Sequence, residues 1–257
     1  MTRVTLLTKL YSSNQRCLID ETLQVLFEGL DVKVAVEVDK NSFWVTVSLT
    51  GEDEAIAKNI LARDIGFCPS IIENIMPSST LKGFVTDLKN SSKDLLVDVG
   101  VYQPKPVLAN VPLENLQAKL AEANRFALDE IADLWGICEN LPLKIKVVNV
   151  DILNRRIKAE LATEQIEKYL FWRDSLLDRL LVFGASLSQI KLAVTQALLN
   201  RDIIDIEYLG MFEHALVCKL GTDAAGLIPR LGRRIRAATF TVFNPRKIYA
   251  FFNSCLT

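Results

Sequence analysis

The sequence lacks the features that mark membrane and exported proteins. Its most apolar runs are interrupted by Asp, Lys or Arg, so none approaches the roughly 18 apolar residues of a membrane span. The opening TRVTLLTKLY alternates polar and apolar residues as a strand does. It lacks the basic, apolar and small-residue regions that follow one another in a signal peptide. With 257 residues, 50% of them hydrophobic, and a mean hydropathy of +0.21, we expect a soluble cytoplasmic protein of two or three units.

Residues and spacings typical of catalysis are scarce as well. There is one histidine, no P-loop and no GxGxxG fingerprint. The cysteines are odd in number, scattered and without a CxxC pair: Cys17, Cys68, Cys138, Cys218 and Cys255. We therefore predict buried thiols, no metal, no cofactor and no enzymatic activity. The alternative is an active site around His214, with Cys218 four positions further on and on the same face of one strand.

Residues 1–67 are expected to form a small ferredoxin-like α+β unit. The predicted elements are a strand at 3–10, a helix at 14–30, strands VKVAVEV and FWVTVSL joined by a turn at 39–42, and a helix at 51–65. The helix at 14–30 is predicted to turn Leu23 and Val25 inward. Acidic residues outnumber basic ones in this unit, which favours a protein-contact surface over an RNA surface.

Residues 80–162 have the pattern of a closed barrel. Gly83-x-Val85 is followed by VDVG at 97–100 and by Val111-Pro112, and two alternating runs at 143–161 are joined by a turn at 151–155. Between them, residues 117–140 repeat apolar positions at helical spacing. We predict a helical pair lying on the barrel, with Trp135 as its packing anchor rather than a platform for stacking bases.

These motifs resemble the OB domain type first known from ribosomal protein S-one. The resemblance implies a five-stranded barrel that binds single-stranded RNA on the face of its middle strands. It also places Arg156 where the family carries an RNA-contacting arginine.

Residues 163–257 are expected to form a second ferredoxin-like α+β unit. The chain reads as helical from 163 to 182, and Ser186 opens another helix with a capping box. We interpret these two helices as a packed hairpin, because the second has too few basic residues for a DNA-recognition helix. Strands follow at 203–209, 213–220 and 237–243, with a helix capped by Thr222-Asp223 before the last strand.

The candidate RNA contacts are basic and aromatic residues in two groups. On the barrel they are Lys82, Phe84, Tyr102, Lys105, Arg155 and Arg156, with Asp151 beside the last two. Because Val85 is expected inside the barrel, Phe84 is expected outside. In the C-terminal unit they are Lys219, Arg230, Arg233, Arg234, Arg236, Arg246 and Lys247.

Arg230, Arg233 and Arg234 would share one face of a helix, which favours a clamp on the RNA backbone. A solvated helix end is the alternative.

The segment EHALVCKLGTDAAGLIPRLGRRIR at 213–236 also resembles an archaeal family described as domain of unknown function 2110, which implies an information-processing setting. We therefore expect a non-catalytic protein that binds single-stranded or ribosomal RNA in translation or transcription. The alternative is an adaptor that docks on a ribosomal subunit or RNA polymerase. A net charge of −1, and Tyr102 as the one aromatic residue close after VDVG, favour that alternative. The sequence leaves the oligomeric state open.

Overall fold

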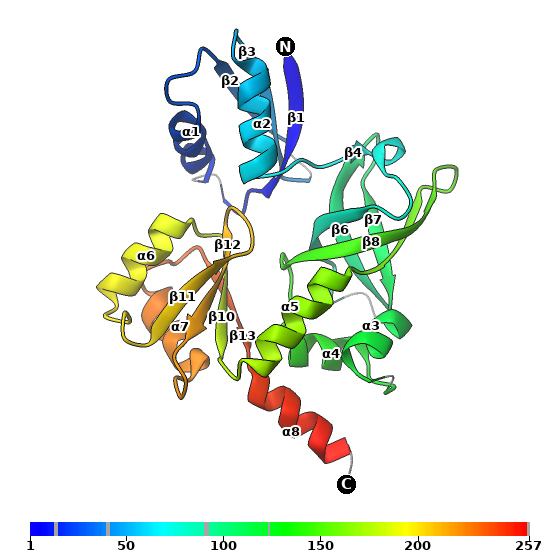
Figure 1. Ribbon diagram of the computed structural model, residues 1–257, viewed down its shortest axis with the longest axis vertical. Coiled ribbons are helices and arrows are strands. Elements are labelled where there is room, and N and C mark those ends of the chain that lie inside the picture. Colours follow the sequence, from blue (N-terminus) through cyan, green and yellow to red (C-terminus); the bar gives the residue numbers. More distant parts are fainter. Residues whose placement is uncertain (13–14, 40–41, 90–92, 123, 256–257) are drawn as a thin grey trace. The chain divides into compact units, whose positions relative to one another are not determined.

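The computed structural model describes residues 1–12, 15–39, 42–89, 93–122 and 124–255 (Figure 1). The chain divides into two compact units. The first holds residues 1–75 and 99–107, and the second holds residues 76–98 and 108–257. The predicted start of the first helix at Asn14 and the centre of the turn at 39–42 lie outside the described residues.

The first unit is built on a three-stranded antiparallel sheet in the order β1-β3-β2. Its elements are β1 (Thr2–Lys9), α1 (Gln15–Leu26), β2 (Lys33–Val38), β3 (Trp44–Thr50), α2 (Glu54–Asp64), β4 (Ser70–Ile71) and the 3-10 turn η1 (Ile72–Asn74). A single bridge from Leu6 to Phe67 extends the sheet beyond β1, where a ferredoxin-like unit has its fourth strand.

Helix α1 packs on the sheet through Gln15, Ile19 and Leu23, which are spaced four apart. Val25 is 73% exposed, so the prediction that it faces inward was wrong. It lies two positions beyond Leu23, which turns it to the opposite side of the helix.

Most of a barrel belongs to the second unit. Its elements are β5 (Thr80–Thr86), β6 (Asp94–Gln103), β7 (Val107–Pro112), α3 (Leu113–Leu120), α4 (Leu128–Trp135), β8 (Pro142–Asp151) and β9 (Arg156–Leu161). Residues 99–107, at the end of β6 and the start of β7, are counted with the first unit. The strands close in the order β5-β6-β7-β9-β8, with β7 and β9 parallel. This five-stranded closed barrel is the fold that the OB resemblance implies.

Alternation along β8 and β9 closes the barrel around an apolar interior. Leu143, Ile145 and Val147 point inward, while Lys144 and Lys146 point outward. Gly83 allows β5 and β6 to approach closely, because a Cβ there would lie 2.6 Å from the carbonyl oxygen of Asp98.

The rest of the second unit is a ferredoxin-like α+β sandwich. Its elements are α5 (Thr163–Asp174), β10 (Arg179–Phe183), α6 (Leu187–Gln196), β11 (Ile203–Tyr208), β12 (Glu213–Cys218), α7 (Ala224–Gly232), β13 (Thr239–Phe243) and α8 (Pro245–Cys255). The antiparallel sheet has the order β11-β12-β10-β13. The expected α+β class, with a central barrel and flanking ferredoxin-like units, is confirmed.

Two expectations for residues 163–182 were wrong. The chain is not helical throughout, because Arg179–Phe183 forms the central strand β10. Consequently α5 and α6 are not a helical hairpin. All five residues of β10 are buried, and a short, fully buried apolar run has no alternation to distinguish a strand from a helix. The capping box at Ser186 is confirmed, since its Oγ accepts from the backbone nitrogen of Gln189.

An aromatic cluster of Trp135, Tyr169, Trp172 and Phe243 joins the barrel to this sandwich. Trp135 is 1% exposed and its Nε1 donates to the carbonyl oxygen of Leu120 at 3.0 Å, so its role as packing anchor is confirmed. The ring of Tyr169 lies 5.6 Å from that of Trp135 and 6.4 Å from that of Phe243. The second unit therefore has one continuous core running from α4 through α5 to β13.

The hydroxyl of Tyr169 is buried in this cluster with no hydrogen-bond partner among the described residues. Burial also raises the pKa of Tyr169 well above its usual value, so the group stays protonated. We expect Tyr169→Phe to stabilise the protein by about 1 kcal/mol, because an unsatisfied buried hydroxyl is removed without loss of packing. Tyr169→Ala should instead destabilise it by about 3–5 kcal/mol. Urea denaturation measures both, and a destabilised Tyr169→Phe would show that the hydroxyl has a partner.

Candidate nucleic-acid interface

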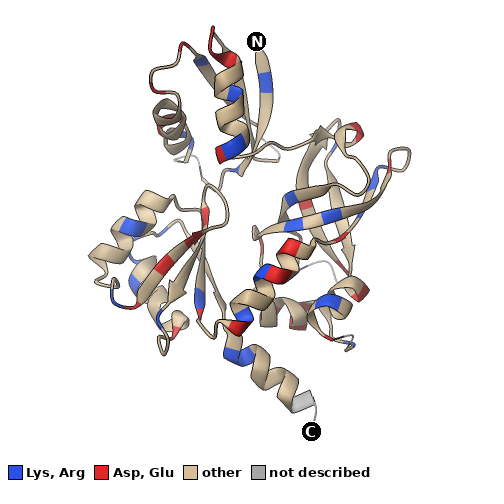
Figure 2. Ribbon diagram, in the orientation of Figure 1, with Lys and Arg blue, Asp and Glu red and all other residues tan. Residues whose placement is uncertain are grey.

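The outer face of β5, β8 and β9 is the most basic surface of the barrel. We call it the barrel basic face and define it by Lys82, Lys144, Lys146, Arg156 and Lys158. Lys82 and Lys144 are directly opposite each other on β5 and β8. Two acidic residues share the outward positions of these fully described strands: Glu160, whose carboxylate lies 3.9 Å from Lys146 Nζ, and Asp151, which is directly opposite Arg156. Figure 2 shows basic segments on the barrel strands at the front of the view.

The face of the middle strands has a different character. The outward positions of β6 include Asp94 and Asp98, and Asn110 on β7 donates to Asp94 at 2.9 Å. A phosphate backbone would be repelled by these carboxylates. The face implied by the resemblance is therefore acidic here, and the cations lie on the other strands of the same barrel.

The two aromatic candidates do not reach a barrel surface. Phe84 is 0% exposed, so its expected outward orientation was wrong. Phe84 and Val85 are neighbours on β5 and point to opposite faces of the strand. Both are buried, because both faces of β5 are covered at this point. The hydroxyl of Tyr102 lies 3.0 Å from that of Thr5 and 3.2 Å from that of Thr46, within the first unit. Neither ring is placed to stack a base on the barrel.

The turn between β8 and β9 is ordered by Asp151. Its carboxylate accepts from the backbone nitrogen and the side-chain amide of Asn154 at 2.9 and 2.7 Å, and these bonds lower the pKa of Asp151. The predicted hairpin is confirmed. Arg155 follows in the left-handed region with a φ of 51°, and Arg156 begins β9 with its side chain outward. Lys105 is exposed and belongs to the first unit.

The arginine-rich segment does not share one helical face. Helix α7 ends at Gly232, with Arg233 as its C-cap and Arg234 beyond it. The expected common face was therefore wrong. Arg230 donates to the carbonyl oxygen of Ala197 and lies 3.9 Å from Asp202. The remaining basic residues predicted here are exposed: Lys219, Arg233, Arg234, Arg236 and Arg246.

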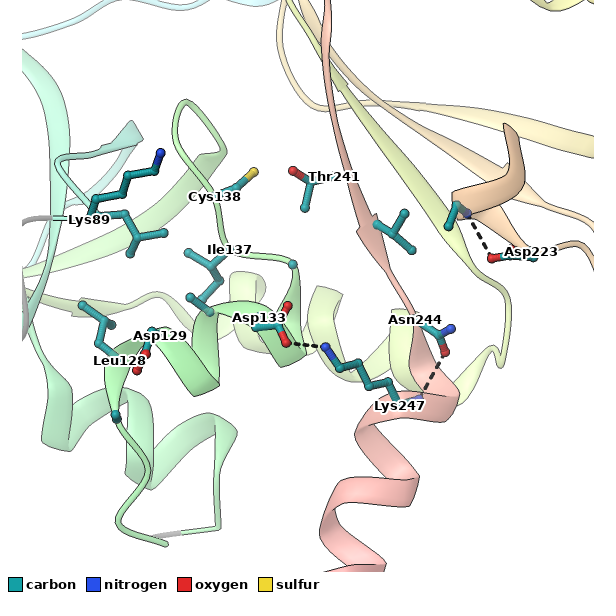
Figure 3. A pocket seen from close by; sticks show the side chains of 16 residues that line it. Lys89, Leu128, Asp129, Asp133, Ile137, Cys138, Asp223, Thr241, Asn244 and Lys247 are labelled. Carbon is teal, nitrogen blue, oxygen red and sulfur yellow. Dashed lines mark hydrogen bonds and ion pairs between the residues drawn. The ribbon is translucent and has the colours of Figure 1, made fainter. Parts of the chain in front are cut away.

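A cavity of about 780 Å³ lies between α4 and the elements β13, α7 and α8 (Figure 3). Lys247 at its edge forms an ion pair with Asp133, and the backbone nitrogen of Lys247 donates to Asn244 at 3.1 Å. Asp223 caps α7 by accepting from Ala225 at 3.0 Å. Asp133, Lys247 and Asp223 therefore have structural contacts, and Lys247 is a weaker candidate for phosphate binding than the sequence indicated.

The surroundings of His214 and Cys218 on β12 do not favour nucleophilic chemistry. Both side chains are 0% exposed. Burial lowers the pKa of His214 to about 4 and raises the pKa of Cys218 to about 11, so both are neutral near pH 7. A cysteine nucleophile needs a thiolate and a basic partner, and burial disfavours the charged forms of both groups.

Four lysines were not among the residues predicted from the sequence. Lys144, Lys146 and Lys158 belong to the barrel basic face, and Lys168 lies near it. Alternation along 143–161 carried the information for the first three, since each is polar between inward apolar residues. The position of Lys168 beside the face could be found only from the tertiary structure, because Lys168 belongs to α5, which packs beside β8.

Taken together, the chain is a multidomain α+β protein with a closed OB-type barrel and a basic outer face. Models of one family match nearly its whole length: the DUF2110 N-terminal domain at 3–70, the central domain at 75–173 and the C-terminal domain at 177–243. The chain belongs to the DUF2110 family.

No curated protein matches this chain. Two solved structures show limited similarity, at 13% identity each. One is described as an a/eIF2alpha-aDim2p-rRNA complex from Pyrococcus horikoshii OT3, with a TM-score of 0.26 over 48% of this chain and 63% of that chain. The other is a multidomain protein with nucleic acid binding domains from Streptococcus pneumoniae TIGR4, with a TM-score of 0.20 over 79% of this chain and 54% of that chain. The matches thus span less than two thirds of either solved chain, and such scores do not establish a shared overall arrangement.

Among the described residues, no helix is long and apolar enough to span a membrane.

The buried His214 predicts a loss of stability in mild acid. Its pKa falls from 6.5 in the unfolded chain to about 4 in the fold, so the unfolded state binds more protons between these values. The stability contribution is complete above pH 6.5 and is lost as the pH falls towards 4. We expect the free energy of unfolding to drop by roughly 2 kcal/mol between pH 7.5 and pH 5.

Urea titrations of the wild type and of His214→Gln at both pH values measure the contribution of His214 to the free energy of unfolding. The variant removes the only histidine, so the difference between the two chains isolates its titration. Equal pH dependence in both chains would mean that His214 is solvated.

Proposed function

We propose that this protein is a non-catalytic RNA-binding protein of translation or transcription that holds single-stranded or ribosomal RNA by its phosphate backbone. The observation that carries the proposal is the barrel basic face, with five cations against two acids, Glu160 and Asp151, on the outward positions of three adjacent strands. Single-strand binders commonly combine a basic surface that tracks the backbone with an OB-type barrel. The resemblance to the OB domain of ribosomal protein S-one type supports RNA as the ligand.

The chemistry of the face supports backbone contacts rather than base reading. Its outward positions carry no aromatic side chain among the described residues of β5, β8 and β9. Lysine and arginine bind phosphate without reading bases, so affinity there would depend on salt more than on sequence. Arg155 and Arg156 at the β8–β9 turn occupy the loop that OB-folds use for oligonucleotides.

Neutralising the outer end of the face should weaken RNA binding. For the triple variant Lys146→Gln, Arg156→Gln and Lys158→Gln, we expect affinity for a labelled oligouridylate to fall at least 10-fold in low salt. The slope of log affinity against log salt should fall by roughly 2, because about 0.7 is lost for each phosphate contact. Fluorescence anisotropy at several salt concentrations measures both quantities.

A matched control carries the same change of charge on elements other than the barrel strands, at Lys33→Gln, Lys58→Gln and Lys191→Gln, all exposed. Affinity and slope should stay close to those of the wild type. Equal losses of RNA affinity in both triple variants would show that binding depends only on net charge. That result would overturn the barrel basic face as the binding surface.

The exposed arginines after α7 provide a second test. Arg233→Ala with Arg234→Ala should weaken binding to structured ribosomal RNA fragments and flatten its salt dependence, because long RNA can reach the C-terminal sandwich as well as the barrel. Unchanged affinity and slope would mean that this segment is a solvated helix end. A short oligouridylate should be less sensitive to this change than the ribosomal fragments.

A protein-interaction adaptor is the second candidate, and the tip of the β8–β9 hairpin favours it. Ile152 is 50% exposed and Leu153 is 95% exposed. Exposed apolar side chains at a rigid tip are suited to insertion into a partner surface. Under this alternative, Leu153→Ser would abolish a nuclease-resistant complex with purified ribosomal subunits or RNA polymerase while leaving RNA affinity unchanged.

A further inference from the structure

One end of the barrel basic face meets the C-terminal sandwich in a compact group of cations. Lys82 on β5 is directly opposite Lys144 on β8, and like charges at such a position repel each other. Lys168 on α5 adds a third ammonium group, with its Nζ 4.7 Å from the ring centre of Trp172. Helix α5 packs on β8, where Gln165 accepts from the backbone nitrogen of Lys144 at 3.1 Å. Three elements thus bring lysines to one place.

Glu207 on β11 acts electrostatically on Lys168, and its carboxylate is already engaged. It accepts from Trp172 Nε1 at 2.8 Å and from Arg179 Nε at 3.0 Å. The buried Arg179 adds another positive charge, with its Cζ 5.1 Å from the ring centre of Trp172. Lys168 and Arg179 thus share the single negative charge of Glu207, and a bound anion would add a second negative charge beside them.

The pKa of Lys168 reflects the same surroundings. Burial lowers it to about 8, Glu207 opposes that shift, and the charges of Lys82, Arg179 and Lys144 lower it further. All these charged groups belong to the second unit.

An exposed aromatic ring borders the cations. Tyr208 at the end of β11 is 55% exposed, and Lys82 Nζ lies 5.9 Å from its ring centre. Lys82 also donates to the carbonyl oxygen of Leu209, which ties β5 to the end of β11. His214 supports the ring of Tyr208 edge to face, at 5.8 Å between centroids. A held but exposed ring beside phosphate-binding cations is what base stacking requires.

We propose that Lys82, Lys144, Lys168 and Tyr208 form a nucleotide-binding subsite, here called the junction site, in which the lysines bind a phosphate and Tyr208 stacks the attached base. The inference deepens the proposed function and depends on it, because the junction site continues the barrel basic face. It provides the aromatic contact that the face itself lacks. RNA would pass from β9 across β8 and β5 to the edge of the C-terminal sheet.

The test separates the base contact from the phosphate contacts. Oligouridylate and inorganic polyphosphate are titrated into the full chain by fluorescence anisotropy and calorimetry, respectively. Tyr208→Ala should lower oligouridylate affinity about 5-fold or more and leave polyphosphate affinity unchanged, because polyphosphate has no base. Tyr208→Phe keeps the stacking surface and should bind as the wild type does. Lys144→Gln with Lys168→Gln should weaken both ligands.

Tyr249→Ala removes another exposed tyrosine, on α8, and serves as the matched control, with Lys191→Gln for the lysines. Both should bind like the wild type. If Tyr208→Ala and the double lysine variant bind oligouridylate as the wild type does, the junction site is overturned. The proposed function then stands if the triple variant of the barrel basic face is still weakened. If the wild type binds no RNA at low salt, both proposals fail.

Discussion

The contact between α5 and β10 is the constraint on which the second unit depends. Arg179 is 2% exposed, and its guanidinium donates to Glu207, to Ser175 Oγ and to the carbonyl oxygen of Leu177. A buried charge is tolerated only when its donors are satisfied, so this network holds the end of α5 against β11. The aromatic cluster around Tyr169 packs on the same helix. Together they make the barrel and the C-terminal sandwich one body.

This joining determines where cations can act together. Lys144 and Lys168 are 24 positions apart in sequence and on different elements, yet α5 brings Lys168 within electrostatic range of both Lys144 and Glu207. Tyr208 enters the same surface from β11, more than 30 residues beyond Lys168. The surface is therefore a property of the joined unit. The barrel supplies most of the charge, and the sandwich supplies the exposed ring.

Particular elements show which features could be predicted from the sequence. The β8–β9 hairpin alternates from Leu143 to Val147 and has an Asp-Asn turn, so its outward lysines follow from local pattern, although the register shifts between Val147 and Asn149. The glycine at position 83 and the capping box at Ser186 likewise act locally. Strand β10 and Phe84 could not be placed, because each is covered on both faces and local alternation then carries no information.

The sequence by itself determined the α+β class, the closed barrel and the two ferredoxin-like units, because strand alternation, helical spacing and turn residues are encoded within short segments. It also determined that basic residues exist in excess between 219 and 247. Only the tertiary structure decided that the middle-strand face is acidic, that Arg230 and Lys247 are held by neighbouring groups, and that Lys144 and Lys168 lie near Lys82, which borders Tyr208. Electrostatic surfaces depend on distances between elements, and packing sets those distances.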